Sequence, residues 1–190
     1  MSIGTVTWKE PVVLLLLGTS GVGKTSVLEY LQSHHSFESS PKYTTRKLRN
    51  NVSDERDFIF CHTIKDFPKD DILIFQSYGY AFGIQIERIK SSITRGRNHV
   101  LAIGDTETAI TLKSIFPHQT KVIQLYCEYN ILKTRIVFST DVERASRWKT
   151  IDKEVQGVYS WAGVVDDILD CTMQFDITKI HVDKLIDKIR

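Results

Sequence analysis

The feature that most constrains this chain is the stretch of residues 12–25, VVLLLLGTSGVGKT. Its apolar start has the length and composition of a buried strand. A glycine-rich turn follows directly, and the lysine and threonine after it open a segment with apolar residues at helical spacing. The pattern G-x-x-x-x-G-K-[ST] between a buried strand and a helix is typical of a phosphate-binding loop.

Each residue type in this loop has a chemical reason. Backbone N–H groups must point at phosphate oxygens, and glycine allows the close approach and the positive φ angles that this requires. Lys24 can reach the β and γ phosphates of a nucleotide, the helix N-terminus adds partial positive charge, and the Thr25 hydroxyl can ligate Mg²⁺. The sequence therefore predicts ATP and Mg²⁺ as cofactors. The expected nucleotide-binding residues are Gly18, Thr19, Ser20, Gly21, Val22, Gly23, Lys24, Thr25 and Ser26.

Composition narrows the class of protein. At 190 residues, with 42% hydrophobic and 25% charged residues, the chain suits one soluble domain. A net charge of +2 gives no indication of nucleic acid or a membrane as partner. Three cysteines without a C-x-x-C pattern indicate neither a disulfide framework nor a zinc site, so we expect a cytoplasmic protein. As a separate expectation, the protein is a monomer or a weak dimer.

Apolar periodicity predicts strands that alternate with helices. This alternation is typical of an α/β fold with a parallel sheet flanked by helices on both faces. The expected strands are Val12–Leu17, Phe58–Cys61, Ile72–Phe75, Val100–Ile103, Lys121–Tyr126 and Met173–Ile177. The expected helices are Lys24–His35, Ile64–Phe67, Ile84–Ile93, Asp105–Phe116, Ile131–Val137, Arg147–Leu169 and Ile180–Ile189. Ser39–Asp57 is polar and basic, so we expect it to be a loop outside the core.

Three segments together resemble the guanylate kinase family of nucleoside monophosphate kinases. They are the loop GTSGVGKTS at 18–26, the stretch YTTRKLRNNVSDERDFIF at 43–60, and YGYAFG at 78–83. The resemblance covers nearly the whole chain and implies a single domain with the P-loop kinase fold. Its phosphate-binding core would comprise residues 11–35 and 97–190, a small acceptor-binding α+β insert about residues 36–83, and a lid about residues 138–147.

The resemblance also implies how the acceptor is held. Arg46 and Arg49 match the family's two arginines that grip a monophosphate, a role for which a planar guanidinium fork is well suited. Thr45 belongs to the same T-T-R-x-x-R motif. Phe58 and Phe82 stand where the family has phosphate-contacting tyrosines, so the ring shapes are kept and the hydroxyl donors are lost.

The base-reading positions depart from the family. The guanine-contacting serine corresponds to Lys42, the guanine-reading glutamate to Leu73, and the strand carboxylates to Ala102 and Gly104. Asp105, one place later, either takes over a magnesium or acceptor role or caps the following helix.

The lid arginines of the family match Arg135 and Arg147, with Arg144 as an extra candidate. Phosphoryl transfer needs positioning and charge neutralisation, so Lys24, Mg²⁺ and these arginines would carry the catalysis.

Three functions fit these residues. The first is ATP-dependent phosphorylation of a small phosphorylated acceptor, with GMP placed first by the resemblance. The second is a kinase for ribose 1,5-bisphosphate, which the basic cluster around Lys42 favours. The third is a guanylate-kinase-like binding module with weak catalysis, which the missing carboxylates favour and the intact phosphate loop opposes.

Overall fold

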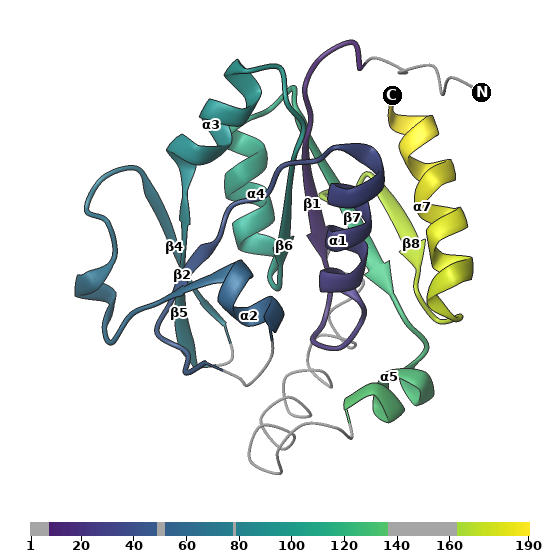
Figure 1. Ribbon diagram of the computed structural model, residues 1–190, viewed down its shortest axis with the longest axis horizontal. Coiled ribbons are helices and arrows are strands. Elements are labelled where there is room, and N and C mark those ends of the chain that lie inside the picture. The colour runs from purple at the N-terminus through teal and green to yellow at the C-terminus, as the bar shows by residue number, and fades with distance from the viewer. Residues whose placement is uncertain (1–7, 49–51, 78, 137–162) are drawn as a thin grey trace.

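A computed structural model describes residues 8–48, 52–77, 79–136 and 163–190. The elements within these ranges form two four-stranded sheets (Figure 1). The main sheet has the order β6-β1-β7-β8, and its strands are all parallel. They are β1 (Val13–Leu17), β6 (His99–Ile103), β7 (Thr120–Tyr126) and β8 (Asp167–Asp170).

Helices cover both faces of the main sheet, which confirms the predicted fold class. On one face lie α1 (Lys24–His35) and α7 (Phe175–Ile189), and on the other α3 (Ile86–Thr94) and α4 (Thr106–Ile115) (Figure 1). Side chains alternate along β1, so Leu14 and Leu16 join the first cluster while Leu15 and Leu17 join the second. All of β1 is therefore buried, as a central parallel strand requires.

The second sheet has the order β3-β2-β5-β4 and lies beside the main sheet (Figure 1). Its strands are β2 (Lys42–Thr44), β3 (Phe58–Phe60), β4 (Ile72–Ser77) and β5 (Tyr80–Gln85). The connections include α2 (Val52–Asp57) and a short 3₁₀ turn, η1 (Ile64–Asp66). After β7, the helix α5 (Tyr129–Ile136) completes the described elements.

Several sequence expectations were wrong. The predicted strand Met173–Ile177 is not a strand, since α7 starts at Phe175. The last strand is instead β8, which overlaps the end of the predicted helix Arg147–Leu169. The helix predicted from Ile84 begins two residues later, because β5 continues through Gln85. Apolar periodicity misplaced these bounds because Ile84 in the strand and Ile86 in the helix face the same apolar cluster.

The segment expected to be a polar loop also contributes to the interior. Thr44 in β2 is fully buried and Arg46 is 6% exposed. No apolar period is visible in this segment because its buried side chains are polar and are held by hydrogen bonds.

His99, at the start of β6, lies within hydrogen-bond distance of Ser40, which comes just before β2 of the second sheet. Its ring is buried, with Nδ1 3.0 Å from Ser92 Oγ and Nε2 3.2 Å from Ser40 Oγ. Burial lowers the pKa of His99 to about 4, although Glu38 opposes the shift and Arg95 adds to it. The imidazole is therefore neutral in the folded protein at pH 5 and above.

We expect this histidine to make the protein sensitive to acid. Because its folded-state pKa lies below the unfolded value, its contribution to stability is present above about pH 6.5 and is lost as pH falls toward 4. The free energy of unfolding should fall by about 2 kcal/mol between pH 7.5 and 5. Urea unfolding at both pH values measures this, with the exposed His118→Gln as control. His99→Gln should flatten the profile, and an equally steep profile in that variant would contradict the assignment.

Candidate functional site

The phosphate loop joins β1 to α1, and its backbone leaves the helix start open to an anion. Gly23 adopts a left-handed conformation with φ 113° as N-cap of α1 and makes no side-chain cap. A side chain would be strained there, and the first turn of α1 carries no acidic residue. The N–H groups of the first helical turn and the helix dipole therefore favour a bound phosphate.

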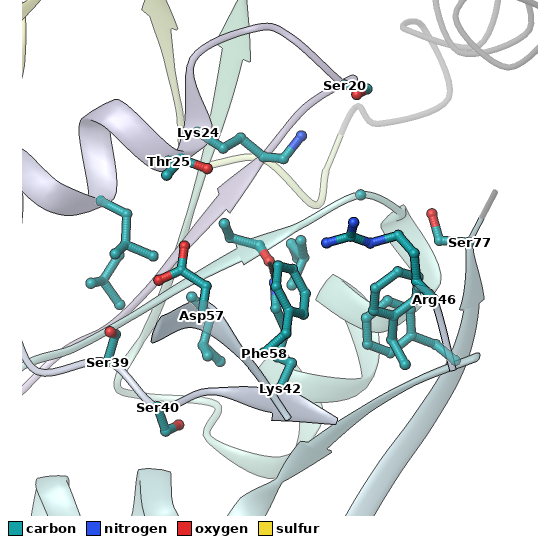
Figure 2. Close-up of a pocket in the computed structure, with 18 of the residues that line it drawn as sticks. Ser20, Lys24, Thr25, Ser39, Ser40, Lys42, Arg46, Asp57, Phe58 and Ser77 are labelled. Atoms are coloured by element: carbon teal, nitrogen blue, oxygen red, sulfur yellow. Dashed lines mark hydrogen bonds between the residues drawn. The ribbon is translucent and has the colours of Figure 1, made fainter. Parts of the chain in front are cut away.

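Lys24 lies over this loop. Its Nζ donates hydrogen bonds to the carbonyl oxygens of Gly18 at 2.5 Å and Thr19 at 2.7 Å. Gly18 has no room for a side chain, because an added Cβ would lie 3.0 Å from both Leu125 O and Val22 Cγ1. The lysine amine is thus held at the loop, beside the exposed Thr25 (Figure 2).

A cavity of about 600 Å³ extends from the loop to the second sheet. Its wall combines the loop and α1, the carboxyl end of β6, and side chains of the second sheet (Figure 2). Of the residues expected to bind substrate or nucleotide, those that line it are Ser20, Gly21, Gly23, Lys24, Thr25, Ser26, Lys42, Arg46, Phe58 and Phe82. The structure therefore brings the predicted nucleotide loop and much of the predicted acceptor site to one cavity.

The end of β2 and the turn after it form hydrogen bonds with Ala81 of β5. Thr44 Oγ1 donates to Ala81 O at 3.2 Å and accepts from Arg46 N at 3.1 Å. Thr45 N donates to Ala81 O, and Thr45 Oγ1 accepts from Ala81 N, both at 3.0 Å. Thr45 does not line the cavity, so its observed contact positions the turn that presents Arg46.

Arg46 lies against aromatic rings. Its guanidinium carbon is 4.9 Å from the ring centroid of Phe58 and 5.9 Å from that of Phe60. Phe82 stacks on Phe75 with centroids 5.5 Å apart and an interplanar angle of 18°. Phe58 and Phe82, predicted at tyrosine positions, thus contribute to the apolar wall of the cavity, and Phe58 also lies against the Arg46 guanidinium.

Lys42 and Asp57 bring opposite charges to this wall. Lys42 Nζ donates to Ala102 O and lies 5.2 Å from the Phe58 ring centroid. Burial lowers the pKa of Lys42 to about 8, while the nearby Asp57 carboxylate partly offsets the shift. Asp57 also accepts a 2.8 Å hydrogen bond from Arg56 Nε, and Arg56 pairs with Glu29 on α1 at 3.0 Å. This links α2 to the helix that follows the phosphate loop.

The positions expected to read guanine carry no carboxylate. Leu73 pairs with Ile84 across the second sheet, packs against the apolar cluster and does not line the cavity. Ala102 and Gly104 line the cavity with an apolar or absent side chain.

Asp105 caps α4, which is one of the two alternatives left open by the sequence. Its Oδ1 accepts from Thr108 N at 2.7 Å, its Oδ2 accepts from Thr108 Oγ1 at 2.8 Å, and it does not line the cavity.

Asp105→Ala should therefore lower the free energy of unfolding by about 1 kcal/mol. Asp105→Ser should restore most of the loss, because serine also caps helices. Urea unfolding of both variants measures the effect. A changed affinity for a phosphorylated acceptor in the serine variant would instead favour the acceptor role.

Arg135 borders a second, smaller cavity of about 260 Å³ on another side of the phosphate loop. Its guanidinium donates to Cys171 O at 2.7 Å, to Thr172 O and Met173 O at 3.3 Å, and to Val22 O at 3.4 Å. Val22 and Arg135 both line this cavity. Arg49, Arg144, Arg147 and the predicted lid lie outside the described residues.

Sequence reasoning missed several lining residues. They are Leu28, Ser39, Ser40, Asp57, Phe75, Ser77, Tyr80, Val100, Leu101 and Ile103. For Asp57 a signal existed, because it is the first residue of the D-F-x-F segment. Ser39 and Ser40 had no motif, and only the pairing of residue 38 with β6 carries them to the cavity.

Among the described residues there is no cluster of three or more metal-ligating side chains. A magnesium ion would instead use the Thr25 hydroxyl together with phosphate oxygens, which suits a cation that keeps several waters. None of the described helices has the length and hydrophobicity to span a membrane.

Curated relatives point to one family. The chain is 26% identical to a guanylate kinase of Clostridium acetobutylicum, over 96% of this chain and 88% of the relative. It is 25% identical to the guanylate kinase of Clostridium tetani, over 95% and 93% of the two chains. Over nearly its whole length, the chain is similar in sequence to guanylate kinases.

The solved structures agree on the fold of this guanylate kinase relative. A guanylate kinase from Anaplasma phagocytophilum superposes with a TM-score of 0.69 at 16% identity, covering 96% of this chain and 87% of the other. No protein-family model matches the chain. The positions that the resemblance assigns to base reading carry Lys42 and Leu73 in this chain.

Proposed function

We propose that this protein transfers the γ-phosphoryl group of ATP to a nucleoside monophosphate. In this reaction the bond between the γ phosphorus and the β-bridging oxygen breaks, and a phosphate oxygen of the acceptor forms the new bond. ADP leaves with the bond electrons, and the acceptor becomes a diphosphate. The similarity to guanylate kinases supports a nucleoside monophosphate kinase and favours GMP as the acceptor.

One observation carries the proposal: a single cavity contains both Lys24 of the phosphate loop and Arg46 of the second sheet. Two groups that bind phosphate from different elements can align a donor and an acceptor phosphate, which is most of what phosphoryl transfer asks of a protein. The cavity of about 600 Å³ is large enough for a small phosphorylated acceptor.

The chain's own residues have distinct roles in this proposal. The α1 N-terminus and Lys24 bind the donor phosphates, and Arg46 neutralises and orients the acceptor phosphate. Mg²⁺, when bound at Thr25, would neutralise charge on the transferring group. The second cavity, which lies on another side of the loop and contains Arg135, is the place we assign to the rest of ATP.

A second candidate acceptor is a sugar bisphosphate such as ribose 1,5-bisphosphate. The observation in its favour is the Lys42 ammonium in the cavity wall, which adds a cation on the acceptor side. The cavity-facing carboxyl end of β6 also carries no carboxylate at the positions of Ala102 and Gly104.

ADP release with Mg·ATP tests both candidates against GMP, dGMP, IMP, AMP, UMP, CMP and ribose 1,5-bisphosphate. We expect turnover with at least one nucleotide and none in Lys24→Ala. Turnover with the sugar bisphosphate alone would replace the nucleotide proposal.

Thermal unfolding with and without Mg·ATP separates an enzyme from a binding module. A ligand that binds only the native state raises stability by RT ln(1 + [L]/Kd). We expect a clear stabilisation by Mg·ATP. Its absence, together with no turnover, would favour the binding module.

A further inference from the structure

An ammonium group sits in an otherwise largely apolar part of the acceptor cavity. Lys42 starts β2, and its Nζ donates to Ala102 O on β6, so the side chain bridges the two sheets. The ring of Phe58 lies 5.2 Å from the nitrogen. Figure 2 shows Lys24 at the phosphate loop and Lys42 at Phe58 on the second sheet, so the two lysines reach the cavity from different elements.

This ammonium has little compensation within the protein. The charged groups that act on it are Asp57, which favours the protonated form, and Arg46, which opposes it. Among the described residues, no carboxylate lies within salt-bridge distance of Lys42, and its hydrogen bond to Ala102 O uses one of three N–H donors. A desolvated cation with donors to spare is costly unless a ligand or water completes its shell.

We propose that Lys42 reads an oxygen atom at the far end of the acceptor, namely a carbonyl oxygen of an oxo-substituted nucleobase. This inference rests on the proposed phosphoryl transfer to a nucleotide and specifies its acceptor class. Guanine, hypoxanthine, xanthine and uracil present such an oxygen. Adenine and cytosine place an amino group at the corresponding ring position, and an ammonium has no acceptor to offer it.

The chemistry of the wall favours a base over a second phosphate. Phe58, Phe75 and Phe82 line the cavity with apolar side chains, and Phe75 stacks on Phe82 at 5.5 Å. An apolar wall suits a nucleobase, whereas a phosphate dianion would be desolvated there and would lie near the Asp57 carboxylate. Both chemistries offer Lys42 an oxygen acceptor, so the experiment must separate them.

If Lys42 reads the base, the acceptor is selected by its carbonyl oxygen and not by the amino group of guanine. The guanine-reading glutamate is replaced by Leu73, which does not line the cavity. GMP and IMP should therefore be used with kcat/KM values within about 10-fold of each other, since one missing contact in a pocket changes selectivity only modestly. The kcat/KM for AMP should be at least about 100-fold lower than for GMP or IMP, because the amino group of adenine offers the Lys42 ammonium no acceptor.

The test compares wild-type protein, Lys42→Met and the control Lys69→Met, an exposed lysine. Methionine keeps the length of the side chain and removes the charge. In Lys42→Met the ratio of kcat/KM for GMP or IMP over AMP should fall at least about 10-fold, and Lys69→Met should retain the wild-type ratio. Calorimetric binding of GMP, IMP, AMP and ribose 1,5-bisphosphate to each variant gives the same comparison without turnover.

These readouts also separate the inference from the proposed function. Absence of turnover, with oxo-nucleotides still bound in preference to AMP through Lys42, would overturn only the transferase. Equal loss for all nucleotides in Lys42→Met would overturn base reading, because it would make Lys42 a general electrostatic or structural group. Binding of the sugar bisphosphate alone, or of no nucleotide, would also overturn it. A further readout is pH: the preference for oxo-bases should weaken above pH about 8, where Lys42 loses its proton.

Discussion

Replacing Lys24 with alanine should lower kcat for ADP release by at least about 10³-fold, because the phosphate loop then loses its one positioned cation for the transferring group. The amine lies at the loop already, within hydrogen-bond distance of Gly18 O and Thr19 O. Since these carbonyls belong to the loop itself, the Lys24 amine can move from them to a phosphate bound at the loop with little displacement. Steady-state ADP release at saturating Mg·ATP measures the effect, with Lys69→Ala as the matched control.

Circular dichroism and urea unfolding establish that Lys24→Ala still folds. Lys24→Met is the second variant, since it keeps the volume of the side chain and removes the charge. If either variant, folded, transferred phosphate at the wild-type rate, the phosphate loop would not be the site of chemistry.

The second large effect should come from Arg46→Ala. We expect the KM for the acceptor to rise about 100-fold while the KM for ATP changes little, because a charge-assisted, two-pronged contact to phosphate is lost. Arg46 is 6% exposed and lies between Phe58 and Phe60, so its orientation is fixed before the acceptor binds. Initial rates with each substrate varied in turn separate the two KM values.

Arg46→Lys and Arg88→Ala complete this experiment. Lysine keeps the charge but lacks the planar fork, so we expect an intermediate KM for the acceptor. Arg88 is exposed on α3 and serves as the control. Equal changes in both KM values for Arg46→Ala would indicate a general disturbance of the cavity, and no change would remove Arg46 from the acceptor site.

The sequence was most informative where backbone requirements are strict. The phosphate loop, the strand before it and the helix after it were all predicted, because a buried parallel strand, glycine at φ 113° and a Lys-Thr pair leave few alternatives. The strands β6 and β7 were found for the same reason, since continuous apolar runs of that length occupy the centre of a sheet.

Prediction failed where a segment is short and its partners are distant. β8 has the sequence DILD with one buried residue, so only its pairing with β7 identifies it as a strand. The segment Met173–Ile177 was expected to be a strand, yet α7 starts at Phe175 within it. A local pattern of five residues fits either state, and contact with the rest of the sheet decides between them.

The sequence by itself determined the chemistry of the phosphate loop and the parallel α/β class, and its resemblance to guanylate kinases implied that Lys42 and Leu73 stand at base-reading positions. Only the tertiary structure decided what surrounds these residues. It placed Lys42 on Ala102 and Phe58, assigned Asp105 to the cap of α4, and brought Asp57, Ser39 and Ser40 to the cavity. The physical reason is that the residues of a motif such as the phosphate loop lie on one short backbone segment, so the sequence alone places them together. The charge and shape of a cavity arise where elements 40 to 60 residues apart, such as β2 and β6, come into contact.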